Sequence, residues 1–427
     1  MTTFNDSTTD EPSRTDPDLD APWTYATAAA RRLGVPDDIE QRLLYPTHRQ
    51  RITVPFERDD GSRGVCEGYR VRHDAVRGRY LGPHRYDLSL TGNDCAGLAA
   101  ATTVSAAIAD VPFGGAAGGI AVDPTTLSRD ERVSLTRSYA SRINGLGPED
   151  DVLFPGVGTD ERTMAQIADA VSDRVDRPQN AAVAGKPPAL GGHREITRAA
   201  GHSVAHVTQD VLETDLDRPL SDATVAIYGT GQLGATTARL LEFWGATVIA
   251  MCNDQAGLAA PESENGLDTD LAPSYLERPG ALSAYDDGTT TGTENVLEQD
   301  VDVLILAAPA TAVTAENADE IQADLVVEGA TGSVTPGGQS VLAERDSTVV
   351  PDVLAAVGRP IAAHLEWVES LGRDQMSDAR VTNEFGYALT DAVDDVRDRR
   401  ERCSLSWREA AYSVGLSRVA AAYEVVR

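Results

Sequence analysis

A glycine-rich turn between an apolar strand and a helix constrains this 427-residue chain more than any other feature. The turn consists of Gly229, Thr230, Gly231, Gln232, Leu233 and Gly234. It follows ATVAIY (223–228) and leads through a helical segment to ATVIAMC (246–252). In this context GxGxxG predicts a dinucleotide-binding βαβ unit, with the pyrophosphate at the helix N-terminus. The ribose acceptor is expected after the second strand, at Asn253 or Asp254, so NAD or NADP binding is predicted without a preference.

Strands alternate with helical segments on both sides of this turn. VDVLILAA (301–308), ADLVVEGA (323–330) and STVVPD (347–352) predict further parallel strands, and therefore an α/β fold. RITVPFERDDG (51–61) and GVCEGYRVRHD (64–74) predict a pair of strands joined by a turn at Asp60-Gly61.

The charge balance limits the partners of the chain. The formal net charge is −30, and Lys186 is the one lysine beside many arginines. Such a field repels nucleic acid and anionic membrane surfaces, so neither is expected as a partner. Concentrated salt would screen the self-repulsion, and we interpret the composition as halophilic. Arginine codons favoured by a GC-rich genome are the alternative explanation, and both can hold together.

The termini and the cysteines indicate no export, membrane span or metal site. The polar, acidic residues 1–20 predict a disordered tail rather than a signal peptide. No uninterrupted apolar run reaches about 18 residues, so a cytoplasmic location is expected. The 4 cysteines form no CxxC pair, which argues against a disulfide framework or a zinc site. His202 and His206 lie four apart, but Ser203 stands in place of the HExxH glutamate, so no metal is expected.

Many separate stretches, in a fixed order from about residue 40 onward, carry a family resemblance. They are RVRHDAVRGRYLGPHRY (70–86), DVPFGGAAGGIAVDPTTLSRDE (110–131), SLTRSYASRINGLGPEDDVLFPGVGT (134–159), VAGKPPALGG (183–192), VEGATGSVTP (327–336), VVPDVLAAVGRPIAAHLEWVE (349–369) and REAAYSVGLSRVAAAY (408–423). By these stretches the chain resembles the glutamate/leucine/phenylalanine/valine dehydrogenases, and among them glutamate dehydrogenase most.

The resemblance implies an N-terminal α/β substrate and oligomerisation domain (21–195) and a C-terminal Rossmann-type domain (196–375). Terminal helices (376–427) are expected to return to the first domain, and 259–295 to form a low-complexity, mostly solvated insertion. The resemblance also implies hexamers, an active site in the cleft between the domains, and NAD(P)-dependent oxidative deamination of L-glutamate to 2-oxoglutarate.

The positions that carry this chemistry in the family hold residues that do not ionise at neutral pH. Carried over from the family, these positions are Leu81, Ser105 and Ala117 for three lysines, Gly156 for the aspartate, Ala356 and Ala363 for an asparagine and a serine, and Ala200 for a threonine. Ala117 stands where the catalytic lysine is expected, and Gly156 where the aspartate would transfer a proton. Composition alone does not explain the losses, because abundant arginine does not replace the lysines and an aspartate-rich chain lacks this aspartate.

We therefore expect a family member that cannot run the reaction by the family mechanism. A pseudoenzyme of this kind would be a regulatory or structural subunit, in a homo-oligomer (a hexamer by resemblance) or in a hetero-oligomer with an active paralogue. One alternative is an NAD(P)-dependent oxidoreductase for a different substrate, with His84 or His364 as the base. Another is an NAD(P)-binding sensor of a small-molecule ligand.

Two more features bear on the same site. VPFGGAAGGI (111–120) is interpreted as a glycine loop whose backbone lies close to substrate and cofactor. Arg79 and Arg85 are candidates for binding an anion, although Arg85 matches a family scaffold arginine, which favours a structural role.

Overall fold

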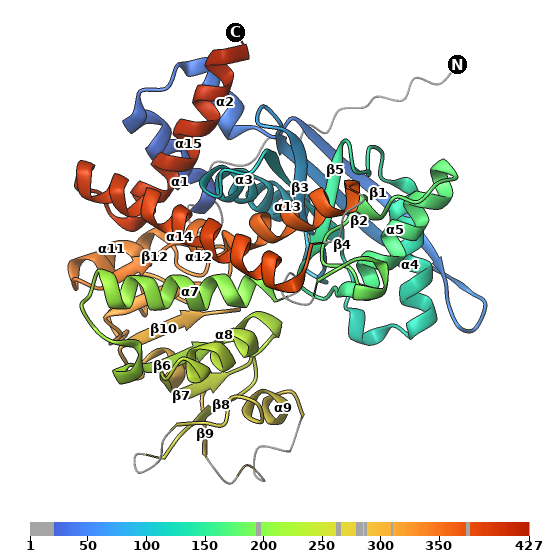
Figure 1. Ribbon diagram of the computed structural model, residues 1–427. Coiled ribbons are helices and arrows are strands. Elements are labelled where there is room, and N and C mark those ends of the chain that lie inside the picture. Colours follow the sequence, from blue (N-terminus) through green and yellow to red (C-terminus); the bar gives the residue numbers. More distant parts are fainter. Residues whose placement is uncertain are drawn as a thin grey trace.

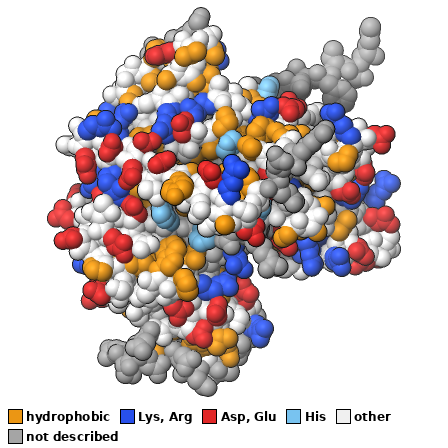
Figure 2. Space-filling model, viewed as in Figure 1, with side chains coloured by type: hydrophobic (Ala, Val, Ile, Leu, Met, Phe, Trp, Pro, Cys, Tyr) orange, Lys and Arg blue, Asp and Glu red, His pale blue; other side chains and the backbone are white. Residues whose placement is uncertain are grey.

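The computed structural model describes residues 21–193, 198–261, 266–278, 285, 288–308, 311–372 and 376–426, so the tail expected at 1–20 lies outside the described residues. Two α/β units lie side by side, and the last helices of the chain cross from one to the other (Figure 1). None of the described helices combines the length and apolarity needed to cross a membrane. The face seen in Figure 2 carries acidic and basic side chains in mixture.

The N-terminal unit is a five-stranded sheet with helices on both faces. Its elements are α1 (Ala21–Leu33), α2 (Asp37–Leu44), β1 (His48–Glu57), β2 (Arg63–Asp74), β3 (Arg79–Tyr86), α3 (Gly92–Ile108), β4 (Phe113–Ile120), α4 (Arg129–Arg142), β5 (Asp151–Pro155) and α5 (Glu161–Val175). The strand order is β1-β2-β4-β3-β5, and β1 pairs antiparallel with β2 across the expected turn, Glu57 opposite Arg63. Helix α3 covers one face, whereas α4 and α5 cover the other.

The segment interpreted as a glycine loop is a central strand, so that interpretation is wrong. Every residue of β4 is buried, between β2 on one side and β3 on the other. A Cβ on Gly114 would overlap the carbonyl oxygen of Asp74 in β2, and one on Gly115 would overlap that of Ala99 in α3. The glycines are therefore required by the close approach of protein backbone rather than by a ligand.

The second unit is a seven-stranded sheet of order β12-β11-β10-β6-β7-β8-β9. Its elements are α7 (Ala199–Thr214), β6 (Thr224–Tyr228), α8 (Gln232–Phe243), β7 (Thr247–Cys252), β8 (Gly257–Ala259), α9 (Ala272–Leu276), β9 (Thr289–Thr291), α10 (Thr293–Leu297), β10 (Val303–Leu306), β11 (Leu325–Glu328), α11 (Pro336–Glu344), β12 (Thr348–Val350) and α12 (Asp352–Ala355). The strands from β12 to β7 are parallel, as predicted, and β8 and β9 add an antiparallel edge. Alternate residues of the central strands face two separate apolar clusters, because both faces of the sheet are covered.

The described parts of 259–295 are less solvated than expected. Strands β8 and β9 extend the sheet, and the side chains of Leu267, Ala272, Leu276 and Tyr285 are buried. Compositional bias did not predict this packing, because these apolar residues are isolated among polar ones.

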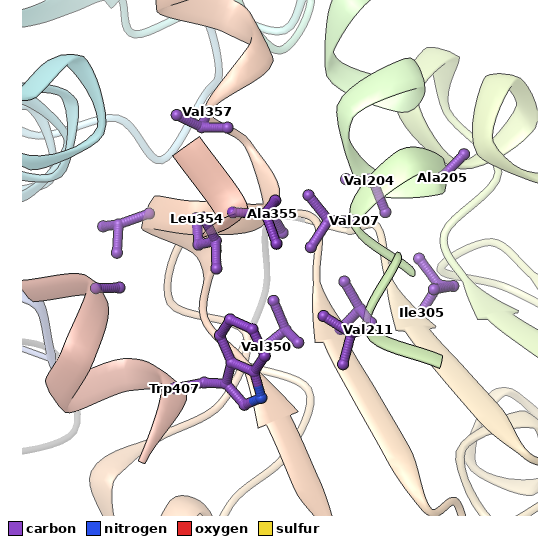
Figure 3. Close-up of a cluster of buried hydrophobic side chains, with 14 of the residues drawn as sticks. Val204, Ala205, Val207, Val211, Ile305, Val350, Leu354, Ala355, Val357 and Trp407 are labelled. Atoms are coloured by element: carbon purple, nitrogen blue, oxygen red, sulfur yellow. The ribbon is translucent and has the colours of Figure 1, made fainter. Parts of the chain in front are cut away.

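The chain ends with α13 (Gly358–Leu371), α14 (Asp378–Cys403) and α15 (Trp407–Val426). Figure 3 shows Trp407, at the start of α15, beside Val350 and Leu354 in the core of the second unit. From there α15 runs back to pack on α1 and α3 of the first unit, which confirms that the terminal helices return to it.

Candidate functional site

A cavity of about 610 Å³ is lined by residues of both units. The first unit contributes the ends of β3 and β5 and the turn after β5. The second contributes the start of α7, the turn between β6 and α8, and the loops after β7, β10 and β11. The helix α13 closes one side through Arg359, Ala362 and Ala363. The cavity therefore lies at the carboxyl ends of the parallel strands, where α/β sheets bind ligands.

The predicted fingerprint has the geometry of a dinucleotide cradle. Gly229 has φ +110°, which an L side chain rarely adopts, and Gly231 is the N-cap of α8. A Cβ on Gly234 would overlap the carbonyl oxygen of Gly229, so this glycine allows the helix to pack on the turn. A Cβ on Gly231 would meet no atom within 4 Å, so its position faces open space in the cavity. The residues present therefore fit a pyrophosphate at the start of α8.

The adenosine end of this cradle is acidic. The side chain of Asn253 is occupied locally: its amide donates to the carbonyl of Leu276 and its oxygen accepts from the backbone N–H of Gln255 and Ala256. Asp254 is exposed and lines the cavity, as does Glu277. Of the two candidate ribose acceptors, Asp254 is thus the one whose side chain is not used to hold the turn.

Five of the seven family positions lie at the site. Gly156, Ala200 and Ala363 line the cavity, and Ser105 and Ala356 line a smaller pocket that adjoins it. Neither Leu81 nor Ala117 lines either space, and both side chains are fully buried.

Leu81 and Ala117 belong to apolar clusters on the α3 side of the first sheet. Leu81 packs in a cluster that includes Phe113, Ala363 and Trp367. Ala117 packs in another, whose other members come mainly from α3. Two positions predicted from the family resemblance to correspond to lysines are thus part of the hydrophobic core.

The space for a side chain at Gly156 is occupied by Arg85. A Cβ on Gly156 would lie 2.8 Å from Cγ of Arg85, 2.9 Å from the carbonyl oxygen of His84 and 3.2 Å from Cβ of Pro83. Contacts this short displace their neighbours, because carbon atoms pack best at about 3.5–4.0 Å. An aspartate cannot be accommodated here without a shift of Arg85 or the backbone.

The remaining polar groups near these positions are already bonded. The hydroxyl of Ser105 donates to the carbonyl oxygen of Val353 at 2.9 Å and so links α3 to α12. The single lysine, Lys186, is fully buried, and its ammonium donates to Glu366 and, at 3.0 Å, to Ser370. Lys186 therefore stabilises the packing of α13 and presents no amine to the cavity.

The two histidines considered as bases do not line the cavity. His84 is fully buried on the opposite face of the sheet, with its ring 4.5 Å from that of Tyr139 in α4. Burial, and then the nearby Arg70, lowers the pKa of His84 to about 3. His364 lies against the rings of Phe113 and Trp367, and burial lowers its pKa. The alternative in which His84 or His364 acts as a base in the cavity therefore lacks support from their positions. His84 lies away from the cavity because residue 84 points away from the side shared by residues 83 and 85.

Arginines are the basic groups that do line the cavity: Arg85, Arg198 and Arg359. Arg79, the other anion-binding candidate, is paired with Glu149 and lies over the ring of Trp367. Sequence reasoning missed Arg359, although it stands between the vacated positions 356 and 363 and could have been examined with them. Within the described residues no group of three or more His, Cys, Asp or Glu side chains could hold a metal.

Comparison with known protein families supports the resemblance found in the sequence, over both units of the chain. Residues 46–173 match the model of the Glu/Leu/Phe/Val dehydrogenase dimerisation domain, and residues 191–426 match that of Glutamate/Leucine/Phenylalanine/Valine dehydrogenase. The chain belongs to the Glu/Leu/Phe/Val dehydrogenase family. The sequence resemblance and the two-unit fold are thereby confirmed.

Individual relatives cover nearly the whole chain. It is 41% identical to the NAD-specific glutamate dehydrogenase A of Halobacterium salinarum, over 99% of this chain and 98% of the relative. It is 42% identical to glutamate dehydrogenase B of Halobacterium salinarum, over 93% of this chain and 92% of the relative. Among solved structures, it matches the hetero-hexameric glutamate dehydrogenase from Thermus thermophilus (Leu bound form) with a TM-score of 0.91. That match has 36% identity and covers 98% of this chain and 99% of the other.

Proposed function

We propose that this chain is a non-catalytic, NAD-binding subunit of a glutamate dehydrogenase-type oligomer that acts in the cytoplasm. The observation that carries the proposal is the composition of the cavity wall. Its ionisable side chains are Arg85, Arg198, Asp254, Glu277 and Arg359 among the described residues.

This set contains no general base at the reacting end. Asp254 lies after β7 and Glu277 after α9, beside the fingerprint and away from Gly156 and Ala363. An arginine stays protonated throughout the physiological range and cannot take a proton from water or an amine. Amino-acid oxidation needs such a proton transfer. The cavity therefore has the residues that would bind a cofactor but lacks a side chain that could act as the general base.

Cofactor preference is proposed from the acidic end of the cradle. Asp254 and Glu277 would repel the 2′-phosphate of NADP, whereas the carboxylate of Asp254 can accept a hydrogen bond from the ribose 2′-hydroxyl of NAD. We expect NADH to bind at least about tenfold more tightly than NADPH. This ratio corresponds to about 1.4 kcal/mol of binding free energy, which we assign to the repulsion of one like-charge contact. Fluorescence titration of both cofactors tests this, and Asp254→Ser is expected to narrow the difference. Equal affinities for the unsubstituted protein would contradict the NAD assignment.

The decisive assay combines binding and turnover on one preparation. NADH is titrated by fluorescence, and cofactor absorbance is followed with L-glutamate, with 2-oxoglutarate plus ammonium, and with branched and aromatic amino acids. We expect saturable NADH binding and no turnover above a Gly231→Val preparation, in which the cradle is filled. That control carries the same contaminating host enzymes. Turnover at rates typical of a dehydrogenase would refute the non-catalytic assignment.

The partner of such a subunit is proposed from the fold. The Thermus thermophilus match is described as hetero-hexameric, and it covers 98% of this chain. We propose that this chain assembles in the same way with a catalytic paralogue. Co-expression with an intact family dehydrogenase, followed by native mass measurement, should give mixed hexamers. Complete segregation of the two chains would favour instead a free-standing NAD-binding sensor, for which the intact cradle is the supporting observation.

A further inference from the structure

The segment 183–193 is attached to α13 at two places. At the first, the carboxylate of Glu366 accepts from the backbone N–H and from the side-chain ammonium of Lys186. At the second, the carboxylate of Glu369 bonds the ring of His193. Because residues 366 and 369 are three apart on a helix, their side chains lie on the same face. The helix α13 packs on elements of both units, so this face belongs to the junction between them (Figure 1).

The second attachment uses both nitrogens of the histidine ring. Nε2 of His193 bonds Glu369, and Nδ1 lies 3.1 Å from a carboxylate oxygen of Asp378, the first residue of α14. Glu369 also accepts from the backbone N–H of Met376, at 3.0 Å, shortly before α14 begins. One imidazole ring therefore joins the end of the segment 183–193 to the corner between α13 and α14.

Both contacts form fully only when the ring is positively charged. A neutral imidazole carries one N–H and a lone pair on its other nitrogen, whereas an imidazolium donates from both nitrogens. An ionised carboxylate has no proton to donate, so a neutral His193 would leave one ring nitrogen facing an oxygen with no proton between them. Loss of the proton thus removes one of the two hydrogen bonds and takes the charge from the other.

The two contacts differ in burial and therefore in strength. The side chain of Glu369 is 5% exposed and that of His193 is 10% exposed, so solvent screens their contact little. Asp378 is 92% exposed, where an ion pair contributes little. Burial by itself lowers the pKa of His193, but the hydrogen bonds to Glu369 and Asp378 outweigh burial and raise this pKa above its ordinary value. The ring is therefore held in its charged form mainly by Glu369.

The other charged side chains beside this corner have partners of their own in the described parts of the chain. Glu366 is paired with Lys186. Arg380, the next charged residue of α14, lies 3.8 Å from Glu384. The charge that changes near neutral pH at this corner is thus that of the histidine, the side chain that ordinarily titrates in this range.

We propose that His193 is a proton-operated latch that fastens the end of the segment 183–193 to the corner between α13 and α14. Because the folded pKa is raised, the stabilisation is complete below the unfolded value of about 6.5 and is lost as pH rises through the folded value. The attachment through Lys186 contains no histidine, so the end of the segment beside the cavity stays fixed while the far end is released. The latch operates whether or not the cavity turns over a substrate.

Hydrogen–deuterium exchange of the full-length protein tests the latch. Peptides are compared between about pH 6 and about pH 9 at one salt concentration, after correction for the intrinsic rate of an unstructured chain. The amides of Gly191, Gly192 and Met376 report on the two sides of the latch. Their corrected exchange should be about fivefold or more faster at the alkaline end, as expected when a charge-assisted hydrogen bond loses its charge. The amide of Lys186, bonded to Glu366, is the internal reference and should not change.

Four variants separate a titrating latch from ordinary packing. His193→Gln keeps a hydrogen-bonding side chain that cannot titrate, so exchange at acidic pH should rise to the alkaline level and lose its pH dependence. Glu369→Gln should move the midpoint of the pH dependence down by about one unit or more. Asp378→Asn should move it less, because this carboxylate is exposed. The exposed His48→Gln removes a histidine elsewhere and is the matched control, which should change neither the rate nor the midpoint.

Several outcomes would overturn the proposal. They are corrected exchange that does not depend on pH, a pH dependence that survives His193→Gln, and a midpoint that Glu369→Gln leaves in place. Equal loss of protection by His193→Gln at both ends of the pH range would also overturn it, because packing alone would act in that way. If His193→Gln fails to fold, the midpoints of Glu369→Gln and Asp378→Asn decide. None of these results bears on cofactor binding or turnover, which test the proposed function separately.

Discussion

Gly156 offers a direct test of the packing at the position where the family resemblance predicts the loss of a catalytic aspartate. The substitution Gly156→Ala adds only the Cβ that any other residue, aspartate included, would bring. This atom would meet Cγ of Arg85 at 2.8 Å and the carbonyl oxygen of His84 at 2.9 Å. Neither neighbour is the free end of a flexible side chain, so the strand ends must move.

The expected loss follows from these contacts. Overpacking a well-packed site by one carbon typically costs about 1–3 kcal/mol. Against this, replacing glycine by alanine restricts the unfolded chain and stabilises by about 0.4–1 kcal/mol. We therefore expect Gly156→Ala to lower the free energy of unfolding by about 1–2 kcal/mol. In an Arg85→Ala background the shortest contact is absent, so the loss should fall by about 1 kcal/mol, a coupling typical of residues in contact.

Chemical denaturation of the two single variants and the double variant, at one salt concentration, measures this coupling. Gly147→Ala is the matched control, because a Cβ there would meet no atom within 4 Å, and it should be neutral or slightly stabilising. The reasoning is refuted if Gly156→Ala is as stable as Gly147→Ala, or if its loss is the same with and without Arg85.

Three more predictions follow from single groups. Gly231→Ala should leave the free energy of unfolding nearly unchanged, because its Cβ meets open space, yet weaken NADH binding by about tenfold in fluorescence titration, because that space is the cradle. Burial and Arg70 hold the pKa of His84 at about 3, below its unfolded value, so the folded state resists protonation and stability is lost as pH falls below about 6.5. Between pH 7 and 5 this group lowers the free energy of unfolding by about 2 kcal/mol, which denaturation curves at several pH values measure. His84→Leu should reduce the dependence of the free energy of unfolding on pH, and an unchanged dependence would contradict the low pKa of His84. Lys186→Met should cost about 3–5 kcal/mol because it leaves the buried carboxylate of Glu366 unpaired, and adding Glu366→Gln should recover part of the loss in the same curves.

The features predicted from the sequence were those with a local signature. The turn from Gly229 to Gly234 carries its own strand–turn–helix context, and the structure places it at the N-terminus of α8. The hairpin turn at Asp60-Gly61 and the alternation of strands and helices are equally local. The prediction that the reactive positions are vacated also required no structure, because it was made residue by residue within stretches that match the family.

The predictions that were wrong concern the tertiary contacts of a residue. The glycines of 111–120 suit a loop or a crowded strand equally well, and only the pairing of β4 with β2 and β3, under α3, distinguishes the two. His84 was considered as a base because it lies close in the chain to Leu81, one of the family positions. A strand alternates its faces, so the distance along the chain did not determine the side on which residue 84 lies.

The sequence by itself therefore determined the family scaffold and the dinucleotide turn, and it predicts that the reactive side chains of the family are absent. Identity at a position is a property of the chain, and no fold can restore an amine to Ala117. Only the tertiary structure decided what occupies the space left behind. It packs Leu81 and Ala117 into apolar clusters, places Arg85 beside Gly156 and places Arg359 at the same cavity. These contacts join segments that are separate in the chain, such as Leu81 with Ala363 and Arg85 with Gly156, and local patterns carry no record of which distant side chains meet.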